Sequence, residues 1–141
     1  MATTRSATAN WQGALLDGHG QVSLDSSGVG SFDVTWASRA ESPEGRTSPE
    51  ELIGAAHATC FSMALSHGLA GGGTPPQRLE TNASVTFEPG KGITGVHLKV
   101  RAHVAGLTEE QFQRAAEDAK ENCPVSQALT GTTITLEAHL A

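Results

Sequence analysis

A long, almost wholly apolar helix at residues 48–70 constrains the fold of this chain more than any other sequence feature. Ser48 is suited to the N-cap, Pro49 to the first helical position, and Glu51 completes a capping box. The glycines and prolines of GGGTPP end the helix. Because a helix of this composition must be covered by other apolar surface, the sequence predicts a core helix, of a kind that two subunits can share.

The helix is about as long as a membrane span, which takes roughly 20 residues. However, Glu50, Glu51, His57 and His67 interrupt its apolar run, so no membrane partner is expected. The N-terminal MATTRSATANWQG lacks an apolar signal region, which predicts a cytoplasmic location. The net charge of −6 and the absence of a basic run make nucleic acid an unexpected partner.

The remaining segments predict the order β-β-β-α-β-β-α-α-β. The first three strands correspond to ANWQGALL, QVSLD and FDVTWASR, with the hairpin signal DGHG after the first, and the polar segment RAESPEGRTS predicts a loop. Residues 79–87 and 96–104 alternate between apolar and polar side chains, which is typical of strands with one buried face. His97 and His103 fall on the polar face, so we expect them to be solvated.

A second helix is predicted after Thr108, which forms a capping box with Gln111. Pro124 then opens a short helix, and TTITLEAHL predicts the last strand. Strands that pair mostly as hairpins, with helices between them, indicate the α+β class. A length of 141 residues suits one domain, 1–141.

Cys60 lies in the middle of the long helix, on one face with His57 and Ala64. A buried cysteine often packs as a small hydrophobe, and a mid-helix thiol gains nothing from the helix dipole. A nucleophilic Cys60 therefore requires a nearby cation. Arg39 and Arg46 in the preceding loop are candidates, although either can be a solvated surface residue.

Cys123 directly precedes Pro124, at the N-cap of the short helix. Free backbone N–H groups and the positive end of the helix dipole favour a thiolate there, so local electrostatics make Cys123 the better nucleophile. Alternatively, it only links two helices. Because no C-x-x-C pair and no zinc-finger spacing is present, no metal site is predicted.

Two motifs together are specific. TSPEELIGAAHATCFSMALS and NCPVSQAL resemble the osmotically inducible protein C / organic hydroperoxide resistance (OsmC/Ohr) family, most closely its OsmC branch. The resemblance extends over nearly the whole chain, including WASRAE and the terminal strand. It implies an OsmC-like α+β fold in which a long central helix packs against antiparallel sheets. It also implies an intertwined homodimer with active sites at the interface.

The resemblance further implies a peroxiredoxin-like, two-cysteine peroxidase of oxidative and osmotic stress defence that reduces organic hydroperoxides and, more weakly, hydrogen peroxide. Cys60 is then the peroxidatic cysteine, and Cys123 resolves it through a disulfide. Glu50 corresponds to the family's carboxylate and Arg39 to its cation, with Arg46 as the alternative because the loop is slightly longer than expected. No bound cofactor is implied, and the reductant is an external dithiol, dihydrolipoamide or a lipoylated protein.

Helix geometry adds one constraint on this site. Glu50 and Cys60 are separated by about 15 Å along the helix axis and point in different directions. A single arginine cannot easily contact both in one straight helix. The spacing favours Glu50 from a second chain, with Glu50 of the same chain as the alternative.

Three other functions fit the same residues. The chain can be a non-enzymatic redox sensor or a lipid-binding stress protein, or a structural dimer whose cysteines are only packed. Turnover separates these hypotheses, because an enzyme consumes hydroperoxide continuously with a dithiol, whereas a sensor is oxidised once.

Overall fold

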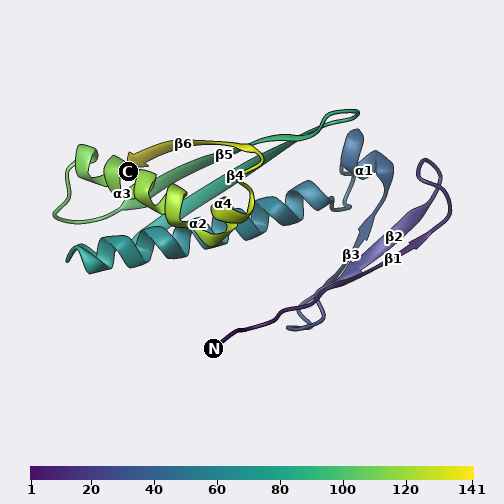
Figure 1. Ribbon diagram of the computed structural model, residues 1–141, viewed down its shortest axis with the longest axis horizontal. Helices are drawn as coiled ribbons and strands as arrows, with labels where there is room; N and C mark the ends of the chain where they lie inside the picture. The colour runs from purple at the N-terminus through teal and green to yellow at the C-terminus, as the bar shows by residue number, and fades with distance from the viewer. The chain divides into compact units, whose positions relative to one another are not determined.

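The computed structural model describes residues 1–141, and its elements fall into two units, Met1–Leu52 and Ile53–Ala141 (Figure 1). The elements are, in chain order, β1 (Thr8–Gln12), β2 (His19–Ser23), β3 (Ser31–Val34), α1 (Trp36–Ala40), α2 (Pro49–Gly71), β4 (Arg78–Glu88), β5 (Gly92–His103), α3 (Glu109–Asn122), α4 (Pro124–Ala128) and β6 (Thr133–Leu140). No helix of the chain, α2 included, combines the length and apolar character that crossing a membrane requires.

The N-terminal unit contains a three-stranded sheet in which β1, β2 and β3 pair antiparallel in sequence order. The first strand is shorter than predicted, since it ends at Gln12 and leaves Leu15 and Leu16 exposed in the turn. Gly13 adopts a left-handed φ of 87°, and a Cβ on Gly18 would lie 2.3 Å from the Ala14 carbonyl oxygen. These glycines close the turn earlier than the DGHG signal indicated.

The element α1 was not predicted. The segment FDVTWASR was expected to be one strand, but β3 ends at Val34 and the chain then turns helical. Thr35 and Ser38 explain the change, because the Thr35 hydroxyl accepts from the Ser38 N–H and the Ser38 hydroxyl accepts from the Thr35 N–H, each at 3.0 Å. This capping box starts a helix where side-chain type alone favoured a strand. It also places Arg39 on a helix and not in a loop.

The helix α2 begins at Pro49 as predicted, with the Ser48 hydroxyl accepting from the Glu51 N–H at 3.1 Å. The predicted return bond from the Glu51 side chain to the backbone of Ser48 is replaced by another contact. The Glu51 carboxylate accepts from the Thr47 hydroxyl at 2.6 Å. Glu51 therefore ties the helix to the preceding segment and leaves Glu50 available for another contact.

The C-terminal unit has two layers, in which α2 and α3 cover one face of the sheet β4-β5-β6 (Figure 1). The predicted alternation in β4, β5 and β6 is confirmed, and His97 and His103 lie on the exposed face. The predicted capping box of Thr108 and Gln111 is also present at the start of α3. The buried core consists of Phe61, Leu65, Leu69, Val96, Leu98, Val100, Ala102, Phe112, Ala116, Ala119, Cys123 and Ala138.

The expectation of antiparallel sheets is wrong for the last strand. β4 and β5 pair antiparallel, but β6 runs parallel to β5, with Val96 opposite Ile134 and Ala102 opposite Leu140. The connection from β5 to β6 passes through α3 and α4. A crossover of this length returns the chain to the same end of the sheet, which a short hairpin cannot do.

Candidate active site

The two cysteines, far apart in the sequence, lie together in the C-terminal unit. Cys60 is in the middle of α2, and Cys123 is at the junction of α3 and α4, where it ends one helix and begins the next. Both thiols are free, and they lie close enough together that the Cys123 thiol raises the pKa of Cys60. Cys60 is partly exposed, whereas Cys123 is fully buried. Their proximity is a precondition of disulfide formation, for which the two sulfurs must approach to about 2 Å.

The N-terminus of α4 interacts with the Cys60 thiol and not with the Cys123 side chain. Cys123 is the N-cap residue, but its side chain makes no capping hydrogen bond. The backbone N–H of Val125, in the first turn of α4, is hydrogen-bonded to Cys60. The sequence-based argument expected the free N–H groups of α4 to stabilise a Cys123 thiolate, but the Val125 N–H acts on the Cys60 thiol instead.

The groups around Cys60 nevertheless favour its protonated form. Burial and the neighbouring Cys123 thiol raise the pKa of Cys60, and the Val125 N–H opposes them only in part. At neutral pH the surroundings within this unit therefore hold Cys60 as a thiol. This agrees with the sequence-based argument that a nucleophilic Cys60 needs a cation from elsewhere.

Cys60 faces a largely apolar cavity of about 600 Å³ between α2 and α3. Its walls include Met63 and Ala64 from α2, Ala115 and Ala119 from α3, and Pro124 at the start of α4. The Met63 side chain is 69% exposed, so this cavity is open to a molecule approaching from solvent. A lining of this kind suits a small apolar substrate better than a hydrophilic one.

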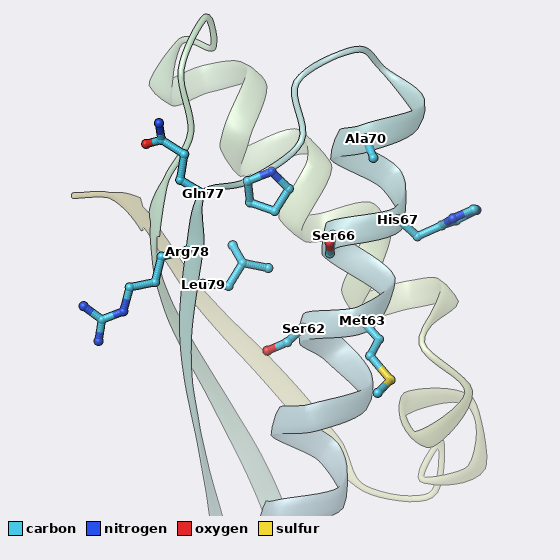
Figure 2. Close-up of a pocket in the computed structure, with 9 residues that line it drawn as sticks. Ser62, Met63, Ser66, His67, Ala70, Gln77, Arg78 and Leu79 are labelled. Atoms are coloured by element: carbon cyan, nitrogen blue, oxygen red, sulfur yellow. The ribbon is translucent and has the colours of Figure 1, made fainter.

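A second cavity of about 540 Å³ lies between α2 and the start of β4, where Ser62 and Ser66 are among its lining residues. Figure 2 shows Leu79 directed toward α2, whereas Gln77 and Arg78 point away from the helix. No thiol lines this cavity, and its polar lining consists of the side chains of Ser62, Ser66, His67, Gln77 and Arg78. The cavity beside Cys60 is therefore the candidate reaction site.

His57, on α2, is a residue whose role the sequence did not indicate. It is fully buried, and its Nε2 lies 2.7 Å from the Oγ of Ser126 on α4. Its Nδ1 is buried without a hydrogen-bond partner. Burial lowers the pKa of His57 below its ordinary 6.5, which keeps the ring neutral at pH 7. The only sequence signal was a histidine on the apolar face that carries Cys60.

Arg39 and Glu50 come together in the N-terminal unit. Arg39 Nη2 lies 2.8 Å from Glu50 Oε1, and Arg39 Nε donates to Oε1 at 2.9 Å and to Oε2 at 3.2 Å. Glu50 is only 7% exposed. Arg46, the alternative cation, is exposed. A bidentate pair with the buried Glu50 carboxylate thus distinguishes Arg39 from a solvated surface arginine.

Local contacts explain how α1 presents Arg39. The Ser38 hydroxyl, 7% exposed as a residue, donates to the Thr47 carbonyl oxygen at 2.9 Å and fastens α1 to the segment before α2. Arg39 also lines an apolar cavity of about 370 Å³ together with Trp11, Leu15 and Trp36, among others. The Arg39 side chain therefore borders an apolar surface while its guanidinium pairs with Glu50.

The fold and the two contacting thiols define an α+β protein with a dithiol site. Residues 42–137 match the sequence model of the OsmC-like protein family. The chain is also 39% identical over 143 aligned residues to Peroxiredoxin OsmC of Escherichia coli strain K12, covering 99% of each chain. The protein therefore belongs to the OsmC-like family.

Solved structures agree with this assignment. The organic hydroperoxide resistance protein OhrB of Bacillus subtilis is 27% identical and matches with a TM-score of 0.66, over 96% of this chain and 98% of that one. An OsmC-like protein from Mycoplasma pneumoniae shares the fold with a TM-score of 0.75 at 15% identity, over 100% and 99% of the two chains.

Proposed function

We propose that this protein is a thiol-dependent, two-cysteine peroxidase that reduces organic hydroperoxides, and more weakly hydrogen peroxide, in the cytoplasm under oxidative or osmotic stress. The observation that carries the proposal is the contact between two free thiols, one of which faces an apolar cavity. The names of the E. coli relative, a peroxiredoxin, and of the B. subtilis structure, an organic hydroperoxide resistance protein, support it.

The proposed cycle begins with attack of the Cys60 thiolate on the distal oxygen of the hydroperoxide. The alcohol leaves, and Cys60 becomes a sulfenic acid. The Cys123 thiol then displaces the hydroxyl of the sulfenic acid, which forms a Cys60–Cys123 disulfide and releases water. An external dithiol, which we propose to be dihydrolipoamide or a lipoylated protein, reduces this disulfide by thiol–disulfide exchange.

Arg39 is the proposed source of the positive charge that Cys60 needs. Because Glu50 and Cys60 are separated by about 15 Å along α2, an arginine bound to Glu50 is out of reach of Cys60 on the same helix. We propose that the Arg39–Glu50 pair of one chain serves Cys60 of a second copy. The exposed apolar side of α2, which includes Ala55, Ala56 and Met63, is the surface that such a homodimer would cover.

A steady-state assay with cumene hydroperoxide and dihydrolipoamide tests the function. Cys60→Ser should abolish turnover, and Cys123→Ser should allow one oxidation of Cys60 per chain without formation of the disulfide, as measured by mass spectrometry. A Cys60→Ser variant with the wild-type rate would contradict the assignment. If the wild-type protein consumes one equivalent and then stops despite excess dithiol, it is a redox sensor and not an enzyme.

A further inference from the structure

We propose that the buried hydrogen bond between His57 and Ser126 positions Cys123 at Cys60 and thereby sets the rate and equilibrium of disulfide formation. His57 and Ser126 are positioning residues, because neither forms part of the thiol pair. Their role in turnover rests on the proposed peroxidase function, but their role in the dithiol equilibrium does not.

The first step of the argument is how weakly α4 is held by its own structure. It spans Pro124–Ala128, only five residues. A helix of this length does not form in isolation, so contacts with the rest of the unit must hold it. Apart from the thiol pair, the bond from Ser126 to His57 is the only hydrogen bond between two side chains that joins α4 to α2, and it adds to the contact of the Val125 backbone N–H with Cys60. The bond from Ser126 to His57 connects residues 69 positions apart.

The second step is the location of this bond relative to the thiols. On α4, Ser126 follows Val125, whose N–H is bonded to Cys60, and lies one turn beyond Cys123. On α2, His57 lies one turn before Cys60. The bond thus fastens the two helices directly beside the point where the thiols meet. Ser126 is 4% exposed and His57 is fully buried, so water does not compete for either group.

The third step is that packing alone does not account for a histidine here. The buried Nδ1 of His57 has no hydrogen-bond partner, which destabilises the fold relative to an apolar side chain of similar size. The bond from Nε2 to Ser126 is the one polar contact that the ring makes. Because burial lowers the pKa of His57 and keeps the ring neutral, this bond persists at neutral pH.

The consequence concerns the step in which Cys123 attacks the Cys60 sulfenic acid. That step forms the S–S bond, breaks the S–O bond and releases the hydroxyl, with the thiol proton, as water. Its rate depends on how often Cys123 occupies attacking position, and anchoring α4 raises that occupancy. Attack of Cys60 on the hydroperoxide forms and breaks no bond on α4, so it should depend much less on Ser126.

A redox titration without hydroperoxide tests the positioning directly. Wild-type protein and Ser126→Ala are equilibrated with oxidised and reduced dithiothreitol, and the fraction of Cys60–Cys123 disulfide is measured by alkylation and mass spectrometry. Loss of one hydrogen bond should lower the disulfide equilibrium constant about five- to tenfold. A tenfold change corresponds to a rise of about 30 mV in reduction potential.

Two further variants sharpen the test. Ser62→Ala is the matched control, because the Ser62 hydroxyl on α2 is hydrogen-bonded to the Thr81 hydroxyl and the Ala58 carbonyl oxygen but makes no bond to α4. It should lower thermal stability without changing the dithiol equilibrium, as a purely structural hydroxyl would. His57→Gln, whose amide can reach Ser126, should retain most of the wild-type equilibrium, whereas His57→Leu should match Ser126→Ala.

The double variant gives the decisive result. If the bond acts as proposed, adding Ser126→Ala to His57→Leu has no further effect on the disulfide equilibrium. An unchanged equilibrium in Ser126→Ala, or effects of the two substitutions that simply add, would overturn the inference. If the wild-type protein consumes no hydroperoxide but Ser126→Ala still shifts the disulfide equilibrium as predicted, only the peroxidase function is contradicted.

Discussion

Replacement of Glu50 by glutamine tests the contact that holds Arg39. Glutamine keeps the size of the side chain and one oxygen, but it removes the charge that two arginine nitrogens contact at 2.8–3.2 Å. A hydrogen bond between charged groups contributes about 1.5–3 kcal/mol. Because the Arg39 side chain is 30% exposed, water screens part of this interaction. We therefore expect the free energy of unfolding to fall by about 1–2 kcal/mol.

Glu51→Gln is the matched control for this substitution. Glu51 lies beside Glu50 in the first turn of α2, so both variants lose the same charge near the N-terminus of the helix. That loss contributes about 0.3–1 kcal/mol in either case. Glu51 differs in being exposed and in contacting the Thr47 hydroxyl and not an arginine. The difference between the two variants therefore isolates the Arg39 contact.

Urea denaturation measures the stability of both variants, and kcat/KM with cumene hydroperoxide measures their activity. If Arg39 stabilises a Cys60 thiolate, its misplacement in Glu50→Gln should lower kcat/KM about 10- to 100-fold, the loss expected for one charge-assisted contact. Glu51→Gln should stay within about twofold of the wild-type value. Equal losses of stability and activity in the two variants would refute the reasoning, because they would show that helix charge and not the arginine contact matters.

Two further predictions concern stability. Because burial lowers the pKa of His57 from 6.5, folding favours its neutral form, and this contribution is present above pH 6.5 and lost as the pH falls through the lowered value. Urea denaturation as a function of pH should therefore show a smaller acid-induced loss in His57→Gln than in the wild type, and parallel curves would contradict the assignment. Gly54→Ala should destabilise the protein by about 1–3 kcal/mol, since the added Cβ would lie 3.0 Å from the Ala83 carbonyl oxygen. Gly68→Ala is on the same helix, and its added Cβ would have nothing within 4 Å, so this substitution should instead stabilise the protein. A loss of stability in both variants would show that the close contact with Ala83 does not explain the effect of Gly54→Ala.

Elements whose cause is local could be predicted from the sequence. The start of α2 at Pro49 and the cap of α3 at Thr108 depend on side chains that bond the backbone within one turn. The alternation in β5 follows from the geometry of a strand with one buried face. The helix α1 was missed for a related reason, since the Thr35–Ser38 capping box is also local but competes with the strand-forming residues before it.

The direction of β6 could not be predicted, because its alternation is the same in a parallel and an antiparallel pair. Only the route of the chain through α3 and α4 decides that it returns alongside β5. The family resemblance pointed to antiparallel sheets and did not resolve this pairing. The bond from His57 to Ser126 could not be predicted from the sequence either, because it joins residues 69 positions apart.

The sequence by itself determined the long helix, its caps, the alternating strands and, through two motifs, the residues on which the proposed chemistry depends. It did not determine which thiol the short helix α4 serves. Local electrostatics favoured Cys123, because only neighbouring residues enter such an argument. The tertiary structure decided otherwise, since packing α4 against α2 directs the Val125 N–H to Cys60 and buries Cys123 beside it. Reactivity at this site is therefore a property of contacts between helices, which spacing along a chain does not encode.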